Sequence, residues 1–177
     1  MRRLADATRI VEFMRELGRA AAEPAQVYFA GGATAVLIGW RQTTVDVDLK
    51  LVPEHESVLR AIPALKESLE LNVELATPDD FIPVPVGWEE RSPFVAQEGR
   101  LTFRHFDLSA QALAKIERGH AQDLADVEEL LERGLVTIEQ IVADFAAIER
   151  DLHRYPAVDQ KSFRRAVEAI GSRGEGP

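Results

Sequence analysis

Two aspartates separated by one residue, Asp46 and Asp48, have types and spacing that suit phosphate chemistry in this 177-residue chain. They belong to the segment VDVDLKL over residues 45–51, whose apolar and polar side chains alternate, as is typical of a strand with one buried face. Both carboxylates therefore leave the same face of the strand. Two hard oxygen ligands that close together suit Mg²⁺, which completes its octahedron with waters and substrate phosphates. A half-buried strand whose acids are only solvated gives the same alternation.

A glycine pair, Gly31 and Gly32, precedes these acids and follows residues 28–30, which we interpret as the end of a buried strand. Glycine allows a tight turn and a close approach to a ligand, and residues 33–40 are expected to continue as a short helix. Backbone amides at such a turn can bind a phosphate. Arg41 and the two threonines Thr43 and Thr44, just before the acids, add a cation and hydroxyls to the same region.

Together these motifs resemble the minimal nucleotidyltransferases of the polymerase-beta-like superfamily. The shared pattern is a Gly-Gly turn, a helix, an Arg-x-Thr segment and an Asp-x-Asp strand, here residues 31–32, 41–43 and 46–48. The chain resembles in particular the branch that includes toxin-related AbiEii-like proteins, in which a later helical segment carries a lysine and an Asp-Leu-x-Asp element. Here these are Lys115 and residues 123–126. The resemblance covers roughly residues 26–134.

The resemblance implies an α/β (α+β) nucleotidyltransferase fold, with a small mixed β-sheet flanked by helices and a helical carboxy-terminal part. It also implies an enzyme that uses Mg²⁺ to transfer a nucleoside monophosphate from an NTP to an acceptor hydroxyl, with release of pyrophosphate. For toxin-related members the acceptor would be a tRNA or a protein hydroxyl, and a cognate antitoxin would be a partner. The implied metal ligands are Asp46, Asp48 and Glu74, and the implied nucleotide-binding residues are Gly31, Gly32, Arg41, Thr43 and Lys115.

The superfamily commonly uses a third carboxylate from a neighbouring strand, which helps to hold the metal and orients or deprotonates the attacking hydroxyl. Glu74 in the strand-like segment LNVELA, residues 71–76, is the best match, although an aspartate is more usual and glutamate is one methylene longer. Asp107, in the strand-like segment LTFRHFDL, is the competing candidate. A site with only two working acids is the third possibility.

The helical motif departs from the family pattern at Gln122, because many relatives carry an arginine directly before the Asp-Leu-x-Asp element. Arg118 or His120 is an alternative source of positive charge. Lys115 would face the triphosphate in the family scheme, or is simply a solvated lysine. Asp123 is expected to be structural, holding Lys115, a helix end or an arginine. These departures favour an alternative class, a noncatalytic nucleotide-binding or protein-interaction module with a degenerate fold, whereas the intact pair of acids argues against it.

Composition excludes several classes. The chain has no cysteine, which excludes disulfides and thiolate metal sites, and its four histidines lack metal-ligand spacing. The formal net charge of −9 argues against a broad nonspecific grip on nucleic acid. Neither a signal peptide nor a membrane span is indicated, so a cytoplasmic location is expected. A local basic groove remains open, because the terminal basic residues can form such a patch, but solvation on helix surfaces is their expected role; they are Arg2, Arg3, Arg9, Lys161, Arg164 and Arg165.

The elements that must position these residues follow from hydrophobic periodicity and breakers. We expect a first amphipathic helix over residues 10–17, ended by Gly18 or by the alanines before Pro24, and further helices over 57–71, 110–118 with a Ser109 cap, 122–133, 137–153 and 158–170. Residues 77–99 predict a long ordered loop, whose Phe81, Trp88 and Phe94 line a pocket or anchor the loop to the core. The domains are then a core over 1–108, a helical part over 109–170 and a disordered tail over 171–177.

Overall fold

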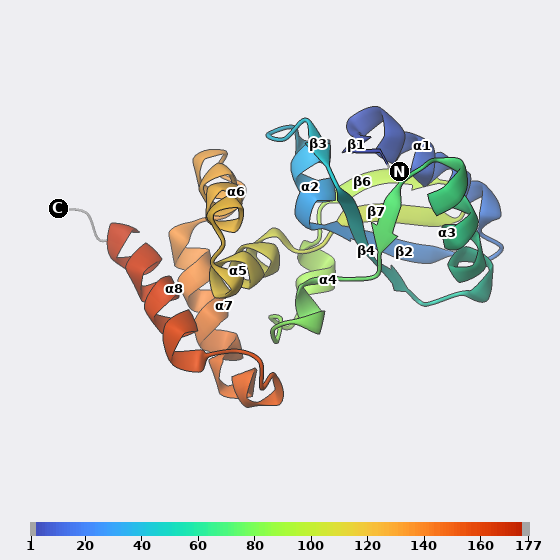
Figure 1. Ribbon diagram of the computed structural model, residues 1–177. Helices are drawn as coiled ribbons and strands as arrows, with labels where there is room; N and C mark the ends of the chain where they lie inside the picture. Colours follow the sequence, from blue (N-terminus) through green and yellow to red (C-terminus); the bar gives the residue numbers. More distant parts are fainter. Residues whose placement is uncertain (1–2, 175–177) are drawn as a thin grey trace. The chain divides into compact units, whose positions relative to one another are not determined.

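The computed structural model describes residues 3–174, and it divides into two compact units (Figure 1). The first unit combines the chain up to Thr77 with Ser92–Phe106, and the second combines Pro78–Arg91 with the chain from Asp107 onward. The predicted boundary at residue 108 assumed that the two parts follow one another along the chain. In the structure each unit is built from two separate stretches of the chain, because residues 78–91 belong with the carboxy-terminal helices.

A mixed five-stranded sheet forms the centre of the first unit, with strand order β5-β4-β2-β7-β6. Antiparallel pairs join β2 to β4 and β6 to β7, whereas β2 pairs with β7 and β4 with β5 in parallel. The small mixed sheet of the predicted fold is thus confirmed. Its strands are β2 (Ala25–Ala30), β4 (Asp46–Val52), β5 (Asn72–Glu74), β6 (Phe94–Glu98) and β7 (Leu101–His105). The sequence did not predict the short antiparallel pair of β1 (Ala5–Asp6) and β3 (Thr43–Thr44).

Three helices complete this unit: α1 (Ala7–Ala20), α2 (Gly31–Ile38) and α3 (Glu56–Ser68). The carboxylate of Asp6 accepts a hydrogen bond of 2.9 Å from the Arg9 amide, which explains why α1 begins there. Of the two predicted ends, Gly18 and the alanines before Pro24, the structure has the second, because α1 ends at Ala20. A Cβ at Gly18 would lie 2.5 Å from the carbonyl oxygen of Glu98, so this glycine allows α1 to approach the backbone of β6 closely.

The core lies on one face of this sheet. Val47, Leu49 and Leu51 of β4 are buried, whereas the alternate side chains of that strand are only half-buried. The helices cover this apolar face because their own apolar stripes belong to the same cluster. Its helical members include Ile10, Phe13, Met14 and Leu17 of α1, Ala33 and Val36 of α2, and Val58 and Ile62 of α3. The acid-bearing face of β4 therefore points away from this core.

The predicted loop over residues 77–99 is wrong. This stretch contains the 3₁₀ turn η1 (Pro78–Asp80), the short helix α4 (Trp88–Arg91) and strand β6. An irregularity between Phe94 and Ala96 breaks the period-two pattern of β6, which hides the strand from periodicity. Phe81 and Phe94 are both more than half exposed, so neither anchors the segment to a core.

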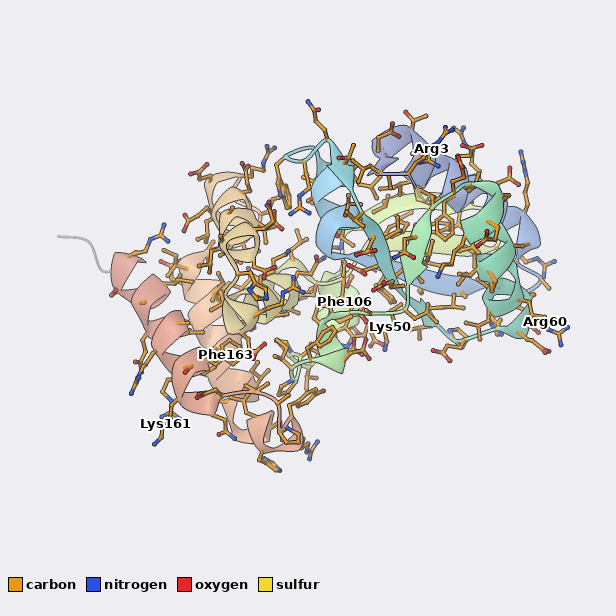
Figure 2. The ribbon with its side chains drawn as sticks, in the orientation of Figure 1. Arg3, Lys50, Arg60, Phe106, Lys161 and Phe163 are labelled. Atoms are coloured by element: carbon orange, nitrogen blue, oxygen red, sulfur yellow. The ribbon has the colours of Figure 1, made fainter. Side chains whose placement is uncertain are left out.

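The second unit contains the remaining helices: α5 (Leu108–Arg118), α6 (Ala121–Glu132), α7 (Ile138–Ile148), the 3₁₀ turn η2 (Glu149–Arg154) and α8 (Gln160–Gly174). The rings of Phe145 and Phe163 meet edge to face at 4.9 Å and join α7 to α8; Phe163 is labelled in Figure 2. Leu124 of α6 and Val142 of α7, apolar residues that helical spacing alone would place on the inner face, are 43% and 40% exposed. Buried aspartates take the inner positions of α6 instead.

Both ends of this helical part differ from prediction. Asp107, not Ser109, caps α5 by accepting a 3.1 Å hydrogen bond from the Ala110 amide, and the Ser109 hydroxyl is buried. The predicted disordered tail begins too early, because α8 continues through Gly174. A Cβ at Gly171 would lie 3.2 Å from Val142, so the small residue permits close packing on α7. Residues 175–177 lie outside the described residues.

Arg3, Arg9 and Arg164, three of the terminal basic residues, have partners within their own units. Arg3 pairs with Glu70 at 2.9 Å, and Arg9 donates to the carbonyl oxygens of Leu4 and Leu69. Arg164 pairs with Glu149 on η2. Arg2 lies outside the described residues. Over residues 3–174, no helix has the length and apolar character needed to cross a membrane.

Candidate active site

Strand register places the predicted acids in two neighbouring rows across the sheet. Asp48 pairs with Ala30 of β2 on one side and with Glu74 of β5 on the other. Asp46 pairs with Asn72 of β5. Residues directly opposite each other point to the same face of a sheet. The side chains of Asp46, Asp48, Asn72 and Glu74 therefore leave the same face, as the sequence predicted for the three acids.

Gly31 brings the start of α2 against one of these acids. Its φ of +58° lies in the left-handed region that favours glycine, and a Cβ there would lie 2.7 Å from Oδ2 of Asp48. The N-cap position is Ala30, whose side chain makes no capping hydrogen bond. The first turn of α2, a helix of eight residues, therefore lies close to the carboxylate of Asp48, with no side chain of Gly31 between them.

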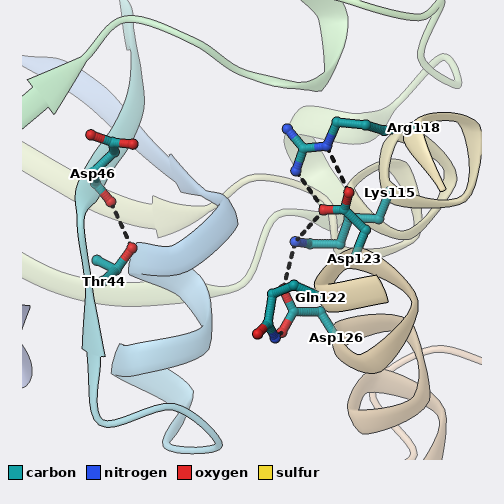
Figure 3. Close-up of polar contacts among 7 residues, drawn as sticks. All are labelled: Thr44, Asp46, Lys115, Arg118, Gln122, Asp123 and Asp126. Atoms are coloured by element: carbon teal, nitrogen blue, oxygen red, sulfur yellow. Dashed lines mark hydrogen bonds and ion pairs between the residues drawn. The ribbon is translucent and has the colours of Figure 1, made fainter. Parts of the chain in front are cut away.

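Gly32 makes room for the segment that leads into β4. A Cβ at this position would lie 1.9 Å from Oγ1 of Thr44 and 3.2 Å from a guanidinium nitrogen of Arg41. Thr44 is buried and donates a 3.0 Å hydrogen bond to the backbone oxygen of Asp46 (Figure 3). Thr43, the predicted nucleotide-binding residue, lies on β3 in register with Asp6. Thr44, the other hydroxyl of this predicted segment, is the threonine at the glycine pair.

Asn72 is a polar residue at this face to which the sequence analysis gave no role. Its amide nitrogen donates hydrogen bonds to Oδ1 of Asp46 and to Oε1 of Glu74, the latter at 3.1 Å. The alternation of the segment LNVELA was the available signal, because it places Asn72 and Glu74 on one face. That pattern does not show which neighbouring strand the pair joins, and the sheet order decides this.

The donor set at this face fits a divalent cation held partly by its substrate. Among residues 3–174, no group of three or more histidine, aspartate or glutamate side chains is gathered as ligands for one metal ion. Asp46 and Asp48 supply two hard carboxylates on one face. This is the number with which Mg²⁺ is usually bound when phosphates and waters fill the other positions.

Asp107, the competing candidate for a third acid, has a structural arrangement in the second unit. Besides capping α5, its carboxylate accepts a 2.7 Å hydrogen bond from Arg91 of α4. Arg91 also donates two hydrogen bonds of 3.1 Å to Asp144 of α7. Burial raises the pKa of Asp107 above its ordinary value, although the charge of Arg91 opposes this rise. Asp107 thus joins α4 to the start of α5.

Lys115 and the Asp-Leu-Ala-Asp element form a compact polar cluster between α5 and α6 (Figure 3). The buried Lys115 ammonium lies 2.7 Å from Oδ2 of Asp126 and 3.7 Å from Oδ1 of Asp123. Arg118 binds Asp123 through two guanidinium nitrogens, Nε at 2.8 Å and Nη2 at 2.5 Å. Gln122 donates a 3.3 Å hydrogen bond to Asp126. In the second unit, Asp123 therefore holds Lys115 and an arginine, as predicted.

The charges of this cluster also explain the acidity of Asp123. Burial acts to raise its pKa, but the hydrogen bond and positive charge of Arg118 outweigh that effect, so the pKa lies below its ordinary value. Lys115 adds to the lowering. The two basic side chains of the cluster, Lys115 and Arg118, thus pair with two aspartates.

His105 connects β7 to the glycine helix within the first unit. The Thr34 hydroxyl donates to the backbone oxygen of Phe29 at 3.2 Å, so its oxygen accepts from Nδ1–H of His105 at 3.0 Å, as assigned from this network. Burial lowers the pKa of His105 from its ordinary value of 6.5 to about 4. The ring is therefore neutral in the folded protein at neutral pH.

We predict that His105 makes the folded state sensitive to mild acid. Between about pH 6.5 and 4, His105 is protonated in the unfolded chain but stays neutral in the folded protein. The free energy of unfolding therefore falls as the pH drops. The contribution amounts to about 3 kcal/mol at the lower end. Urea unfolding at pH 7, 5.5 and 4.5 should show a smaller loss for His105→Asn, whose amide donates to Thr34 but does not titrate. The exposed His153→Asn is the control, and parallel curves for His105→Asn and the wild type would contradict the assignment.

Comparison with known proteins places this geometry in a family. A family model described as "Nucleotidyltransferase of unknown function (DUF6036)" matches residues 5–167, a span that includes all the predicted site residues. No curated protein and no solved structure matches the chain. The match supports the predicted nucleotidyltransferase family, while the AbiEii-like branch stays a prediction. With its glycine pair set against an Asp-x-Asp strand, the chain belongs to the nucleotidyltransferases of unknown function that make up this family.

Proposed function

We propose that this protein is a Mg²⁺-dependent nucleotidyltransferase that transfers a nucleoside monophosphate from an NTP to an acceptor hydroxyl. The main support for the proposal is the close approach of Gly31 to Asp48, because the N-terminus of α2 then lies beside a carboxylate of the kind that binds Mg²⁺. A helix N-terminus attracts phosphate, and a pair of acids attracts the cation that accompanies it. Asp46 on the same face completes the pair.

Asp46 and Asp48 would hold the Mg²⁺. When bound, the ion would neutralise charge on the phosphates and polarise the phosphoryl group. The carboxylates lie on an interior strand of the sheet, with β2 on one side and β5 on the other. Such a position holds their backbone in place, which suits a reaction that depends on alignment.

The first proposed nucleotide contacts come from the glycine turn, which approaches Asp48. Amides of Gly31 and Gly32 would bind phosphate oxygens, and Arg41 would add a guanidinium at the same turn, next to Gly32. Thr43 is retained as a proposed hydroxyl contact. Lys115 is retained as a proposed cation for the triphosphate, although its ammonium is engaged with Asp126.

The acceptor oxygen would attack the α-phosphorus of the NTP in line with the departing group. A new oxygen–phosphorus bond forms, the bond to the bridging oxygen of the β-phosphate breaks, and pyrophosphate leaves with that electron pair. We assign to Glu74 the orientation of the acceptor hydroxyl and the acceptance of its proton. Its position beside Asp48 in the register supports this role.

The test is transfer of label from each of the four α-³²P NTPs to total RNA and to total protein. We expect label to reach one acceptor class with Mg²⁺ present and none with excess EDTA. The Asp46→Ala/Asp48→Ala double variant gives the background. Label on RNA of tRNA size would support a tRNA acceptor, and label on protein would support a protein hydroxyl. Equal label from wild type and double variant would refute the proposed site.

A noncatalytic nucleotide-binding or protein-interaction module is the second candidate function. In the part of the chain that the structure describes, the lack of a preformed three-ligand group favours it. So does the cluster in which Lys115 and Arg118 are matched by Asp126 and Asp123. Mg²⁺-dependent binding of an NTP, measured by calorimetry, without transfer to any acceptor would select this candidate. A cognate antitoxin is a proposed partner under the toxin-related form of the first candidate.

A further inference from the structure

We propose that Asn72 is a positioning residue, which orients Asp46 and Glu74 for their roles in metal binding and proton transfer. The inference rests on the proposed function and deepens it, because it adds to the two acids a neutral residue that sets their geometry. Its basis is one amide that bonds both carboxylates across two strands.

The sheet places Asn72 where it can reach both acids. It pairs directly with Asp46 across the parallel β4–β5 ladder, and Glu74 is its own neighbour two residues along β5. Residues in these two relations share a face and lie close enough for short side chains to touch. The arrangement depends on β5 lying beside β4, which is fixed by main-chain pairing.

The chemistry of the two partners sets the direction of the amide. An ionised carboxylate only accepts hydrogen bonds, and a primary amide offers two donors on its nitrogen. The nitrogen therefore faces Oδ1 of Asp46 and Oε1 of Glu74, and the amide carbonyl is directed away from these two oxygens. The uncharged amide of Asn72 thus fixes the positions of the Asp46 and Glu74 carboxylates relative to each other.

Asn72 acts in this way as the outer partner of a metal ligand. A carboxylate on a strand can adopt several rotamers, and a hydrogen bond to one of its oxygens selects the rotamer that presents the other. Outer partners of this kind typically change metal affinity by about 10–100-fold when removed. The second hydrogen bond of the Asn72 amide, to Glu74, keeps the proposed proton acceptor in place beside Asp48.

The test is a double-mutant cycle on metal affinity, which is read without turnover. Mn²⁺ binding to the full chain is titrated by electron paramagnetic resonance for wild type, Asn72→Ala, Asp46→Ala and the double variant. We expect about 10–100-fold weaker binding for Asn72→Ala in the wild-type background and no further loss in the Asp46→Ala background. Equal losses in both backgrounds, or no loss in either, would overturn the proposal.

Two further measurements separate positioning from a structural effect. Thr102→Val is the matched control, because it removes a 2.6 Å side-chain hydrogen bond to Gln97 between β7 and β6. This variant should leave the Mn²⁺ affinity unchanged. If Asn72→Ala unfolds at a lower temperature than the wild type, the Mn²⁺ titrations are made with Asn72→Leu, which is close to asparagine in size and has no hydrogen-bond donor. Failure of the wild type to bind Mn²⁺ would overturn the metal site itself and this role with it. Intact Mn²⁺ binding by wild type and Asn72→Ala alike would overturn only the role of Asn72.

Discussion

Replacing Asp46 or Asp48 by asparagine is expected to lower the rate of label transfer by about 10³-fold, because each change removes a charged ligand from the proposed Mg²⁺ site. A loss of about 4 kcal/mol of transition-state stabilisation corresponds to that factor. Asparagine keeps the size of the side chain and its oxygen, so the loss reports charge and not packing. Initial rates at saturating NTP and saturating Mg²⁺ measure the effect.

The two single variants also test whether the acids act as one unit. If both hold the same ion, the double variant should be no slower than about the slower single variant, because residues that act together are not additive. Glu54→Gln, an exposed acid just after β4, is the matched control and should keep the wild-type rate. Multiplicative losses, or a slow Glu54→Gln, would contradict a shared metal site.

Lys115→Met is expected to destabilise the protein by about 3–5 kcal/mol, because it leaves the carboxylate of Asp126 buried without its ammonium partner. Asp126 is 1% exposed and lies 2.7 Å from that ammonium. Lys115→Met/Asp126→Leu removes both charges and should recover most of the lost free energy of unfolding. Urea denaturation of the four proteins completes the cycle.

An exposed ion pair provides the contrast for this prediction. Arg60 and Glu56 on α3 form an i,i+4 pair whose side chains are 77% and 73% exposed, so Arg60→Met should cost less than about 1 kcal/mol. Similar small losses for Lys115→Met and Arg60→Met would show that the buried cluster is not structural. NTP affinity of the doubly substituted protein then reports the proposed phosphate role of Lys115, because its fold is restored.

Sequence periodicity predicted the local elements best where one face is buried throughout. The alternation in VDVDLKL and the helical spacing of Ile10, Phe13 and Leu17 both reflect a continuous apolar cluster. Periodicity missed β6, because the irregularity near Phe94 displaces its pattern. It also misjudged α6, where ion pairs with Lys115 and Arg118 allow Asp123 and Asp126 to be buried. A pattern of residue types carries no information about such pairing.

The sequence by itself determined that Asp46 and Asp48 share a face and that a glycine turn precedes them, because strand alternation and the conformational freedom of glycine are local properties. Only the tertiary structure decided which residues meet these groups. The placement of β5 beside β4 brought Asn72 to Asp46 and Glu74 to Asp48, and the close approach at Gly32 placed Thr44 at the glycine pair. These contacts join residues that are distant in the chain, and they depend on strand order and packing, which side-chain periodicity does not specify.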